Sequence, residues 1–286
     1  MSFSKKSQAY FSTKNKKIYA RYKKKPNLID YLDLVKRGVI PRPHYALGIL
    51  MAAHQAYKLG YKKISIIEFG CFNLDGLLDM EQHVKDIKEF INIEFNIFGF
   101  DYGKGLPKME FHEADRMQEW DVGDYSFKDK ENLKSLKKAK IIWGNVNKTV
   151  KKFIKETDLA KAPIGFISND LDYYTSTYKS FDLLKIKPVN FIPRPILYFD
   201  DFFRSSKYEG EYLAIEMFNK KNKKKLSEIL EFTEQLSMFW KKWTYLGTRF
   251  RYLIDFKHPK YKIRYHDLLV LLPDSKSNAN LKESDI

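Results

Sequence analysis

Acidic side chains stand at the ends of several apolar segments in this sequence. The stretch FISNDLDYYTST runs from a buried-strand pattern directly into acids, and the stretch YFDDF does the same. Clustered carboxylates can bind a hard cation through oxygen, and a single carboxylate can hold ribose hydroxyls. Each acid alone is equally well explained as a cap of a helix or turn, but acids at four strand ends are a stronger signal. These acids are Glu68, Asp101, Asp170, Asp172, Asp200 and Asp201.

The elements that must position these acids alternate between strand and helix. Ligands of open parallel sheets bind beyond the carboxyl ends of the strands, near the point where the strand order reverses. The alternation implies parallel crossovers and a doubly wound α/β sheet, so we expect the acids to share one edge. Strands are predicted at 64–69, 94–100, 141–143, 164–168 and 195–199, with helices at 74–91, 146–155 and 175–184.

The rest of the chain is predicted to add to this one α/β domain. Helical spacing before residue 59, broken by Pro41 and Pro43, predicts two helices that cap the domain. Past Gly210 the pattern predicts a helix around 226–240 and β-like runs at 248–256 and 263–272. The expected divisions are a mobile basic arm (1–26), a helical cap (27–62), a Rossmann-like domain (63–274) and a disordered tail (275–286).

The composition indicates a globular chain in a reducing compartment. The chain has 286 residues, of which 44% are hydrophobic, enough for a full core. No apolar run approaches the roughly 18 to 20 residues of a membrane span, and the lysine-rich N-terminus lacks the apolar middle of a secretory signal. We expect a cytoplasmic protein, in agreement with the single cysteine, Cys71.

The charge balance leaves the class of partner open. A formal charge of +16, from 52 Lys plus Arg against 36 Asp plus Glu, would attract nucleic acid, phosphorylated substrates or anionic membrane. The excess is nearly all lysine and no nucleic-acid-binding module is visible, so nucleic acid is not the favoured partner. A surface rich in Tyr and Phe is compatible with a homo-oligomer.

The turn after the first predicted strand, EFGCFNLDGLL, has features of a ligand site. Gly70 and Gly76 would let the backbone approach a ligand, and the next helix points its N-terminus there. The turn lacks the third glycine of the dinucleotide fingerprint, and Asp101 lies well beyond the roughly 20 residues expected, which argues against an NAD enzyme. Ribose recognition by Asp101 and a cationic group facing Glu68 are both satisfied by S-adenosylmethionine.

A combination of short motifs carries a resemblance to a known family. The motifs are GFDYGKGLP, EWDVGDYSF followed by IIWGNV, then FISNDLDYYTST, YFDDF and EGEYLAIEMFN. Together they resemble a bacterial group of class I S-adenosylmethionine-dependent methyltransferases related to the macrocin, or TylF-like, sugar O-methyltransferases. The resemblance runs from about Arg42 to Pro259 and implies a seven-stranded Rossmann-like methyltransferase sheet.

The resemblance also implies roles for individual residues. Glu68 and Gly70 would line the methionine part of the cofactor, Asp101 would hold the ribose, and Asn145 stands where an acid usually contacts the adenine amine. The full set of predicted cofactor residues is Glu68, Gly70, Phe72, Asn73, Asp101, Asn145 and Asp170. Relatives carry a glycine-rich turn where this chain has Phe72, Asn73 and Leu74, and this bulk could narrow the site.

The resemblance further implies a divalent-metal site at Asp172, Asp200 and Asp201. Carboxylates on adjacent strand ends repel one another unless a hard cation such as Mg²⁺ lies between them. A metal on the acceptor hydroxyl would lower its pKa and align it with the methyl group. Asp172 is a predicted catalytic residue, and His258 in FKHPKY is a candidate base, although a structural role is the favoured explanation for that histidine.

The leading hypothesis is therefore an S-adenosylmethionine-dependent O-methyltransferase, assisted by Mg²⁺ or another divalent cation, that acts on a sugar or other small hydroxylated metabolite. Methylation of RNA is an alternative that would use the basic surface. A third hypothesis is a binding or scaffold protein without catalytic activity, because the turn from Cys71 to Asp75 departs from the family pattern.

Overall fold

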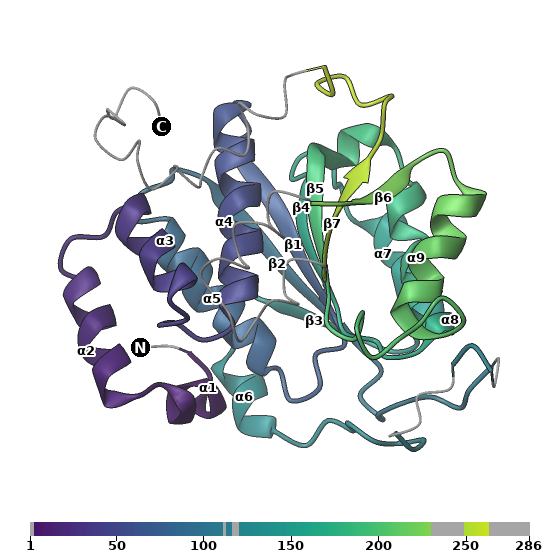
Figure 1. Ribbon diagram of the computed structural model, residues 1–286, viewed down its shortest axis with the longest axis horizontal. Helices are drawn as coiled ribbons and strands as arrows, with labels where there is room; N and C mark the ends of the chain where they lie inside the picture. The colour runs from purple at the N-terminus through teal and green to yellow at the C-terminus, as the bar shows by residue number, and fades with distance from the viewer. Residues whose placement is uncertain (1–2, 111–112, 116–119, 230–248, 263–286) are drawn as a thin grey trace.

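The computed structural model describes residues 3–110, 113–115, 120–229 and 249–262 (Figure 1). Within these residues a seven-stranded sheet in the order β3-β2-β1-β4-β5-β7-β6 lies between two layers of helices. The strands are β1 (Lys63–Phe69), β2 (Glu94–Asp101), β3 (Lys140–Trp143), β4 (Ile164–Asn169), β5 (Phe191–Phe199), β6 (Lys225–Glu228) and β7 (Phe250–Ile254).

The helices that surround the sheet include several that the sequence pattern predicted. They are α1 (Lys5–Tyr10), α2 (Thr13–Tyr22), α3 (Leu28–Lys36), α4 (Pro43–Lys58), α5 (Asp75–Ile87), α6 (Lys130–Ser135), α7 (Val146–Glu156), α8 (Tyr174–Ser180) and α9 (Gly210–Lys221). Two short 3-10 turns, η1 (Leu183–Lys185) and η2 (Pro188–Asn190), precede β5. None of the described helices is long and apolar enough to cross a membrane.

The strand pairing explains why the predicted acids meet. β1 to β5 pair in parallel, whereas β7 runs antiparallel to both β5 and β6. The last residues of the parallel strands lie in one row, because Phe69 pairs with Phe100 and Asn169, and Asn169 pairs with Phe199. The order reverses between β1 and β4, so the predicted doubly wound sheet is confirmed, and its carboxyl edge forms the switch point.

Both faces of the sheet are buried, which is why the strands are apolar without interruption. On β5, Ile196 and Tyr198 belong to the core on one face, whereas Leu197 and Phe199 belong to the core on the other. The first core lies beneath α3, α4 and α5, and the second beneath α7, α8 and α9 (Figure 1). The sheet is thus held rigidly between two apolar layers.

The described part of the basic N-terminal segment is packed against the domain. We expected residues 1–26 to form a mobile arm, but α1 and α2 fold here, and Phe3, Phe11 and Tyr19 are buried in the core on the α5 side of the sheet. Their aromatic rings contact one another rather than repeating along one helix. Local periodicity could not reveal this cluster, because it forms between separate short helices.

The cap and the C-terminal region also differ from expectation. α4 is buried along most of its length and packs on the sheet, so it belongs to a layer of the domain rather than to a separate cap. Residues 225–228, predicted to begin a helix, form the edge strand β6, because they pair with β7. The remainder of that predicted helix, the run 263–272 and the tail 275–286 lie outside the described residues.

Candidate active site

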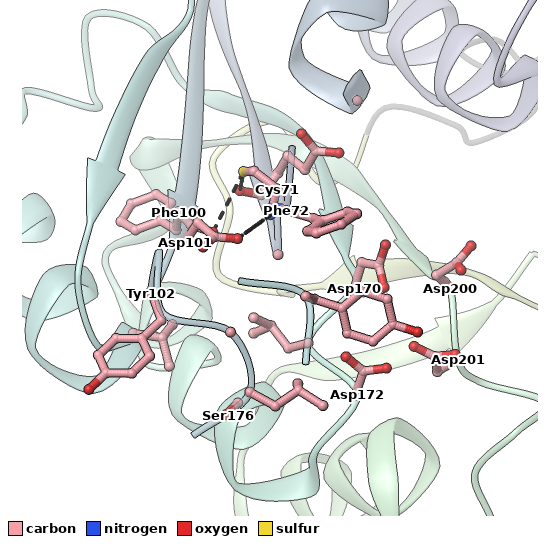
Figure 2. Close-up of a pocket in the computed structure, with 18 of the residues that line it drawn as sticks. Cys71, Phe72, Phe100, Asp101, Tyr102, Asp170, Asp172, Ser176, Asp200 and Asp201 are labelled. Carbon is pink, nitrogen blue, oxygen red and sulfur yellow. Dashed lines mark hydrogen bonds between the residues drawn. The ribbon is translucent and has the colours of Figure 1, made fainter. Parts of the chain in front are cut away.

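A cavity of about 330 Å³ opens at the carboxyl edge of the parallel strands (Figure 2). Its size is in the range of small-molecule sites. The structure brings together nearly every residue that the sequence analysis selected. The lining includes Glu68, Gly70, Phe72, Asn73, Asp101, Asn145, Asp170, Asp172, Asp200 and Asp201.

Backbone strain is concentrated at this cavity. Among the described residues, five that are not glycine have positive φ. Four of them, Arg42, Phe72, Tyr125 and Asp172, line the cavity, and the fifth, Leu74, belongs to the same turn as Phe72. Such conformations cost about 1–3 kcal/mol each and persist where the surrounding structure enforces them, often at functional sites. The strain marks this edge as the functional edge of the sheet.

The turn between β1 and α5 passes very close to β4. Gly70 has a φ of 80°, and a Cβ there would lie 1.7 Å from the backbone oxygen of Asp170. Only glycine fits this crossing. Phe72 and Leu74 adopt φ values of 43° and 67°, and the cavity remains open although this turn lacks the usual glycines. The bulk in the turn therefore does not close the site.

Asp101 at the end of β2 organises the same turn. Its carboxylate accepts hydrogen bonds from the backbone nitrogens of Cys71 (2.9 Å), Phe72 (2.8 Å) and Gly103 (2.6 Å), and Figure 2 shows it beside Phe72. Burial raises its pKa, and these hydrogen bonds oppose the rise. Sequence reasoning gave Asp101 a ligand role with a cap of a turn as the alternative, and the structure shows the carboxylate capping this turn.

The two predicted amide ligands also have structural partners. Asn73 Oδ1 accepts hydrogen bonds from the backbone nitrogens of Lys128 and Asp129, at 3.0 and 3.2 Å. Asn145 caps the N-terminus of α7 by accepting from the backbone nitrogen of Asn147 at 3.0 Å. Both residues line the cavity, and their contact with a cofactor stays a prediction.

Glu68 is buried at the end of β1 with one oxygen unused. Oε1 accepts a hydrogen bond from the hydroxyl of Tyr45 at 2.8 Å, whereas Oε2 has no hydrogen-bond partner among the described residues. Burial raises the pKa of Glu68 to about 7, against the opposing effect of the nearby Arg42 charge. A Cβ at Gly76 would overlap Oε1 at 1.8 Å, so α5 begins directly against this carboxylate.

Three carboxylates form a tight cluster at the ends of β4 and β5. One oxygen from each of Asp170, Asp172 and Asp201 lies within 4.8 Å of the others, and Figure 2 shows their side chains gathered. Burial and the charge of Asp201 raise the pKa of Asp172 to about 8. Burial and the neighbouring carboxylates raise the pKa of Asp170 well above its usual value. The cluster carries repulsion that a cation would relieve.

The observed cluster differs from the predicted metal set in one residue. Asp200 Oδ1 accepts hydrogen bonds from Tyr198 Oη (2.8 Å) and Arg249 Nη1 (3.1 Å). Asp200 is not in the group of three, which instead includes Asp170, predicted as a cofactor residue. The acids that would hold a metal stay a prediction. The difference has a simple cause: β7 brings Arg249 beside β5, and strand-end spacing cannot predict that neighbour.

Glu211 is a further acid beside this cluster, and sequence reasoning missed it. It lies at the start of α9, is fully buried, and accepts a hydrogen bond from the backbone nitrogen of Asp201 through Oε2 at 2.9 Å. Burial and the neighbouring carboxylates, Asp201 first, raise its pKa well above its usual value. Its place within the motif EGEYLAIEMFN was the available signal.

His258, the candidate base, has the structural role that the sequence analysis gave as its alternative. Its Nε2 donates to the backbone oxygen of Phe191 at 3.0 Å, and its Nδ1 accepts from the backbone nitrogen of Lys260 at 3.0 Å. Phe191 begins β5, so this histidine lies at the opposite edge of the sheet from the cavity. Both ring nitrogens are engaged, and the side chain stabilises a loop.

An aromatic wall that the sequence analysis did not select faces the acid cluster. Tyr125 contacts Phe72 edge-on, with ring centres 5.4 Å apart, and contacts Trp120 at 5.1 Å. The guanidinium of Arg204 lies 5.5 Å from the Trp120 ring. Partial burial and the charges of Asp172 and Asp201 raise the pKa of Tyr125 to about 12, so its hydroxyl keeps its proton.

Comparisons with known proteins bear on the fold. No family model matches the sequence, and no curated protein matches it. Among solved structures, the calicheamicin methyltransferase CalS11 is 16% identical over 76% of this chain and 89% of its own, with a TM-score of 0.46. The O-methyltransferase NovP is 11% identical over 78% and 87%, with a TM-score of 0.43. The plantazolicin methyltransferase BpumL, solved with SAH, is 14% identical over 86% and 92%, with a TM-score of 0.33.

The strand order itself decides the fold class. Five parallel strands are followed by an antiparallel β7 inserted between β5 and β6. This is the seven-stranded Rossmann-like methyltransferase fold. The sheet implied by the short motifs is therefore present in the chain.

Proposed function

We propose that this protein is an S-adenosylmethionine-dependent O-methyltransferase that uses a divalent cation and acts on a sugar or other small hydroxylated molecule. One observation carries the proposal. A single cavity joins a nucleoside-type half, formed at the ends of β1 and β2, to the carboxylate cluster at the ends of β4 and β5. Methyl transfer to a hydroxyl needs these two functions side by side.

The first half of the cavity suits the cofactor. The unpartnered Oε2 of Glu68 offers an acceptor to the ammonium group of the methionine moiety. Asp101 lies on the neighbouring strand, where a carboxylate can hold ribose hydroxyls. Asn145 follows β3, one strand farther along the sheet, in the place proposed for the adenine end.

The carboxylate cluster suits a hard divalent cation. Asp170, Asp172 and Asp201 offer only oxygen donors. Arg204 pairs with Asp201 at 3.8 Å, but the carboxylates still raise one another's pKa. Mg²⁺ takes such donors while keeping several waters. When bound there, the cation would supply Lewis acidity that lowers the pKa of an acceptor hydroxyl.

The acceptor hydroxyl must lose its proton as its oxygen takes the methyl group, and the described residues provide a carboxylate for this role. Asp172 lines the cavity within the carboxylate cluster, and a carboxylate there can accept a proton from a hydroxyl whose pKa a bound cation would lower. With His258 placed at the opposite edge, we assign the proton-accepting role to Asp172.

The aromatic wall supports a small acceptor with apolar and polar faces. Phe72, Tyr125 and Trp120 present rings to the cavity, and rings of this kind pack on the C–H faces of sugars and similar molecules. The neutral hydroxyl of Tyr125 can donate a hydrogen bond to an acceptor oxygen.

Calorimetry with S-adenosylmethionine and S-adenosylhomocysteine tests the proposal. Both ligands should bind folded protein and raise its thermal midpoint, because they bind only the native state. Methyl transfer from labelled S-adenosylmethionine to a panel of sugar and small hydroxylated acceptors should require a divalent cation and stop on chelation. If neither ligand binds to protein that circular dichroism shows to be folded, the proposal is wrong.

A further inference from the structure

Two cations from segments that precede the sheet line the cavity. Lys6 on α1 and Arg42, which precedes α4, both line it, although neither belongs to the sheet. Lys6 is exposed and makes no ion pair with any described residue. Arg42 has a φ of 39°, an unfavourable conformation for a side chain of its size. The structure holds this arginine at the cavity despite that cost.

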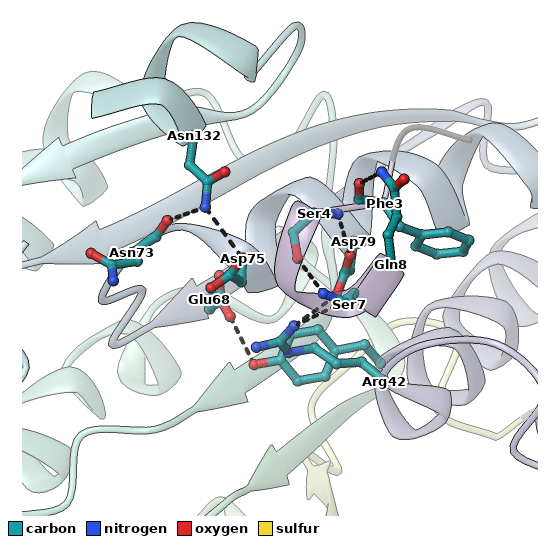
Figure 3. A network of polar contacts seen from close by, with 11 residues as sticks. Phe3, Ser4, Ser7, Gln8, Arg42, Glu68, Asn73, Asp75, Asp79 and Asn132 are labelled. Carbon is teal, nitrogen blue, oxygen red and sulfur yellow. Dashed lines mark hydrogen bonds and ion pairs between the residues drawn. The ribbon is translucent and has the colours of Figure 1, made fainter. Parts of the chain in front are cut away.

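A buried aspartate anchors both α1 and Arg42 (Figure 3). Asp79 on α5 is fully buried and accepts from the backbone nitrogen of Ser4 at 3.0 Å and from Arg42 Nη1 at 2.6 Å. The hydroxyl of Ser7 also donates to Asp79. Lys6 lies between these two serines in the sequence, so the anchoring of α1 at Asp79 also fixes the backbone that carries Lys6 at the cavity.

The same network leads to the free oxygen of Glu68. The Arg42 guanidinium lies 5.8 Å from the Tyr45 ring centre, and the Tyr45 hydroxyl binds Glu68 Oε1. Every hydrogen bond from Arg42 to a described residue uses Nη1, which leaves Nη2 and Nε for a ligand. Arg42 therefore lies near a buried carboxylate that has one unpartnered oxygen, and Lys6 lines the same cavity.

We propose that Lys6 and Arg42 form a carboxylate-binding subsite for the amino-acid end of the cofactor, opposite the ammonium contact of Glu68. An α-amino acid carries an ammonium and a carboxylate on one carbon, and this cavity end offers complementary charges to both. Arg42 would present two N–H groups, and Lys6 would add a compact charge. The inference rests on the proposed function and makes α1 part of the cofactor site.

Binding of two related ligands isolates this subsite. S-adenosylhomocysteine and 5′-methylthioadenosine share the nucleoside and the thioether, but only the first has an amino-acid end. We expect Lys6→Gln to weaken S-adenosylhomocysteine about fivefold and Arg42→Lys to weaken it about tenfold, because lysine cannot offer two parallel donors. Affinity for 5′-methylthioadenosine should be unchanged in both variants.

Lys5→Gln is the matched control, since Lys5 precedes Lys6 on α1 and does not line this cavity. The Lys5→Gln variant should bind S-adenosylhomocysteine and 5′-methylthioadenosine with unchanged affinity. Arg42→Lys keeps a cation beside Asp79, and Lys6→Gln is a surface change, so both variants should fold. If both ligands weaken equally, or if neither changes, the subsite is refuted while the proposed function stands. If the unmodified protein binds neither ligand, the proposed function itself fails.

Discussion

Two groups of acids are buried, one on α5 and one at the carboxyl edge of the sheet. The neighbours of the first group are mainly cations and hydrogen-bond donors, whereas the neighbours of the second group include other carboxylates. Asp86 on α5 accepts from the Tyr19 hydroxyl at 2.5 Å and Lys23 Nζ at 3.1 Å. Asp79 on the same helix is paired with Arg42. Burial raises the pKa of both acids, and every other neighbour that acts on them lowers it.

At the carboxyl edge of the sheet, neighbouring carboxylates add to the effect of burial. The pKa of Asp170 is raised by burial and then by Asp200, Asp201 and other acids, and the same kind of neighbours raise the pKa of Glu211. Paired acids stabilise the fold, because removing one partner leaves the other buried without compensation. Crowded acids destabilise it, so their retention indicates a ligand that offsets the repulsion.

The largest change in stability should come from removing the charge of a paired acid. Asp86→Asn should lower the free energy of unfolding by about 3 kcal/mol, because Lys23 and the Tyr19 hydroxyl lose their charged partner. Chemical denaturation measures this loss. Asp33→Asn, which breaks the exposed pair with Arg37, should cost at most about 0.5 kcal/mol. Equal losses in the two variants would remove the contrast between buried and exposed pairing.

Replacing a crowded acid should raise the free energy of unfolding instead of lowering it. The pKa of Asp172 is about 8 in the folded protein and near its ordinary value of about 3.9 in the unfolded chain. Between these values the folded state keeps a proton that the unfolded state releases, so stability falls as the pH rises from about 4 to 8. Without a divalent cation, Asp172→Asn should therefore raise the free energy of unfolding at pH 8 by about 2 kcal/mol.

The same variant should lose its response to the cation. Mg²⁺ should raise the thermal midpoint of the unmodified protein and of Asp33→Asn, but not that of Asp172→Asn. Denaturation at pH 5 and pH 8, with and without Mg²⁺, measures both effects. A variant that is less stable than the unmodified protein at pH 8 would show that Asp172 is paired after all.

The smallest predicted effect concerns Glu68, whose environment is intermediate between those of the two groups, because one of its carboxylate oxygens is paired and the other is not. Its pKa of about 7 means that it is mostly protonated at pH 6 and mostly ionised at pH 8. An ammonium ligand requires the ionised form, so S-adenosylhomocysteine should bind about tenfold more weakly at pH 6 than at pH 8. Glu68→Gln should bind weakly with no such dependence on pH. A flat profile in the unmodified protein would place the ammonium elsewhere.

Much of the framework was predictable from local patterns. Apolar runs such as Ile64–Phe69 mark strands that are buried on both faces, and their alternation with helices implies parallel pairing. Because parallel strands end at one edge, acids that follow separate strands had to meet, and Asp101, Asp170, Asp172 and Asp201 line one cavity. The meeting of these acids follows from the common direction of the strands alone.

The partners of those acids could not be predicted in the same way. Asp200 leaves the cluster because β7 brings Arg249 to it, and Asp79 binds Arg42 because α1 and α4 meet α5. Lys6 and Tyr125 reach the cavity from segments that have no regular pattern of their own. These contacts join residues far apart along the chain.

The sequence by itself determined the five parallel strands, their common direction and the edge at which the acids gather, because hydrophobic periodicity and chain direction are local properties. Only the tertiary structure decided which acids are neutralised by a cation and which are left facing one another. That choice depends on how separate layers pack, and side chains that are distant in sequence acquire their electrostatic partners only when the layers close around the sheet.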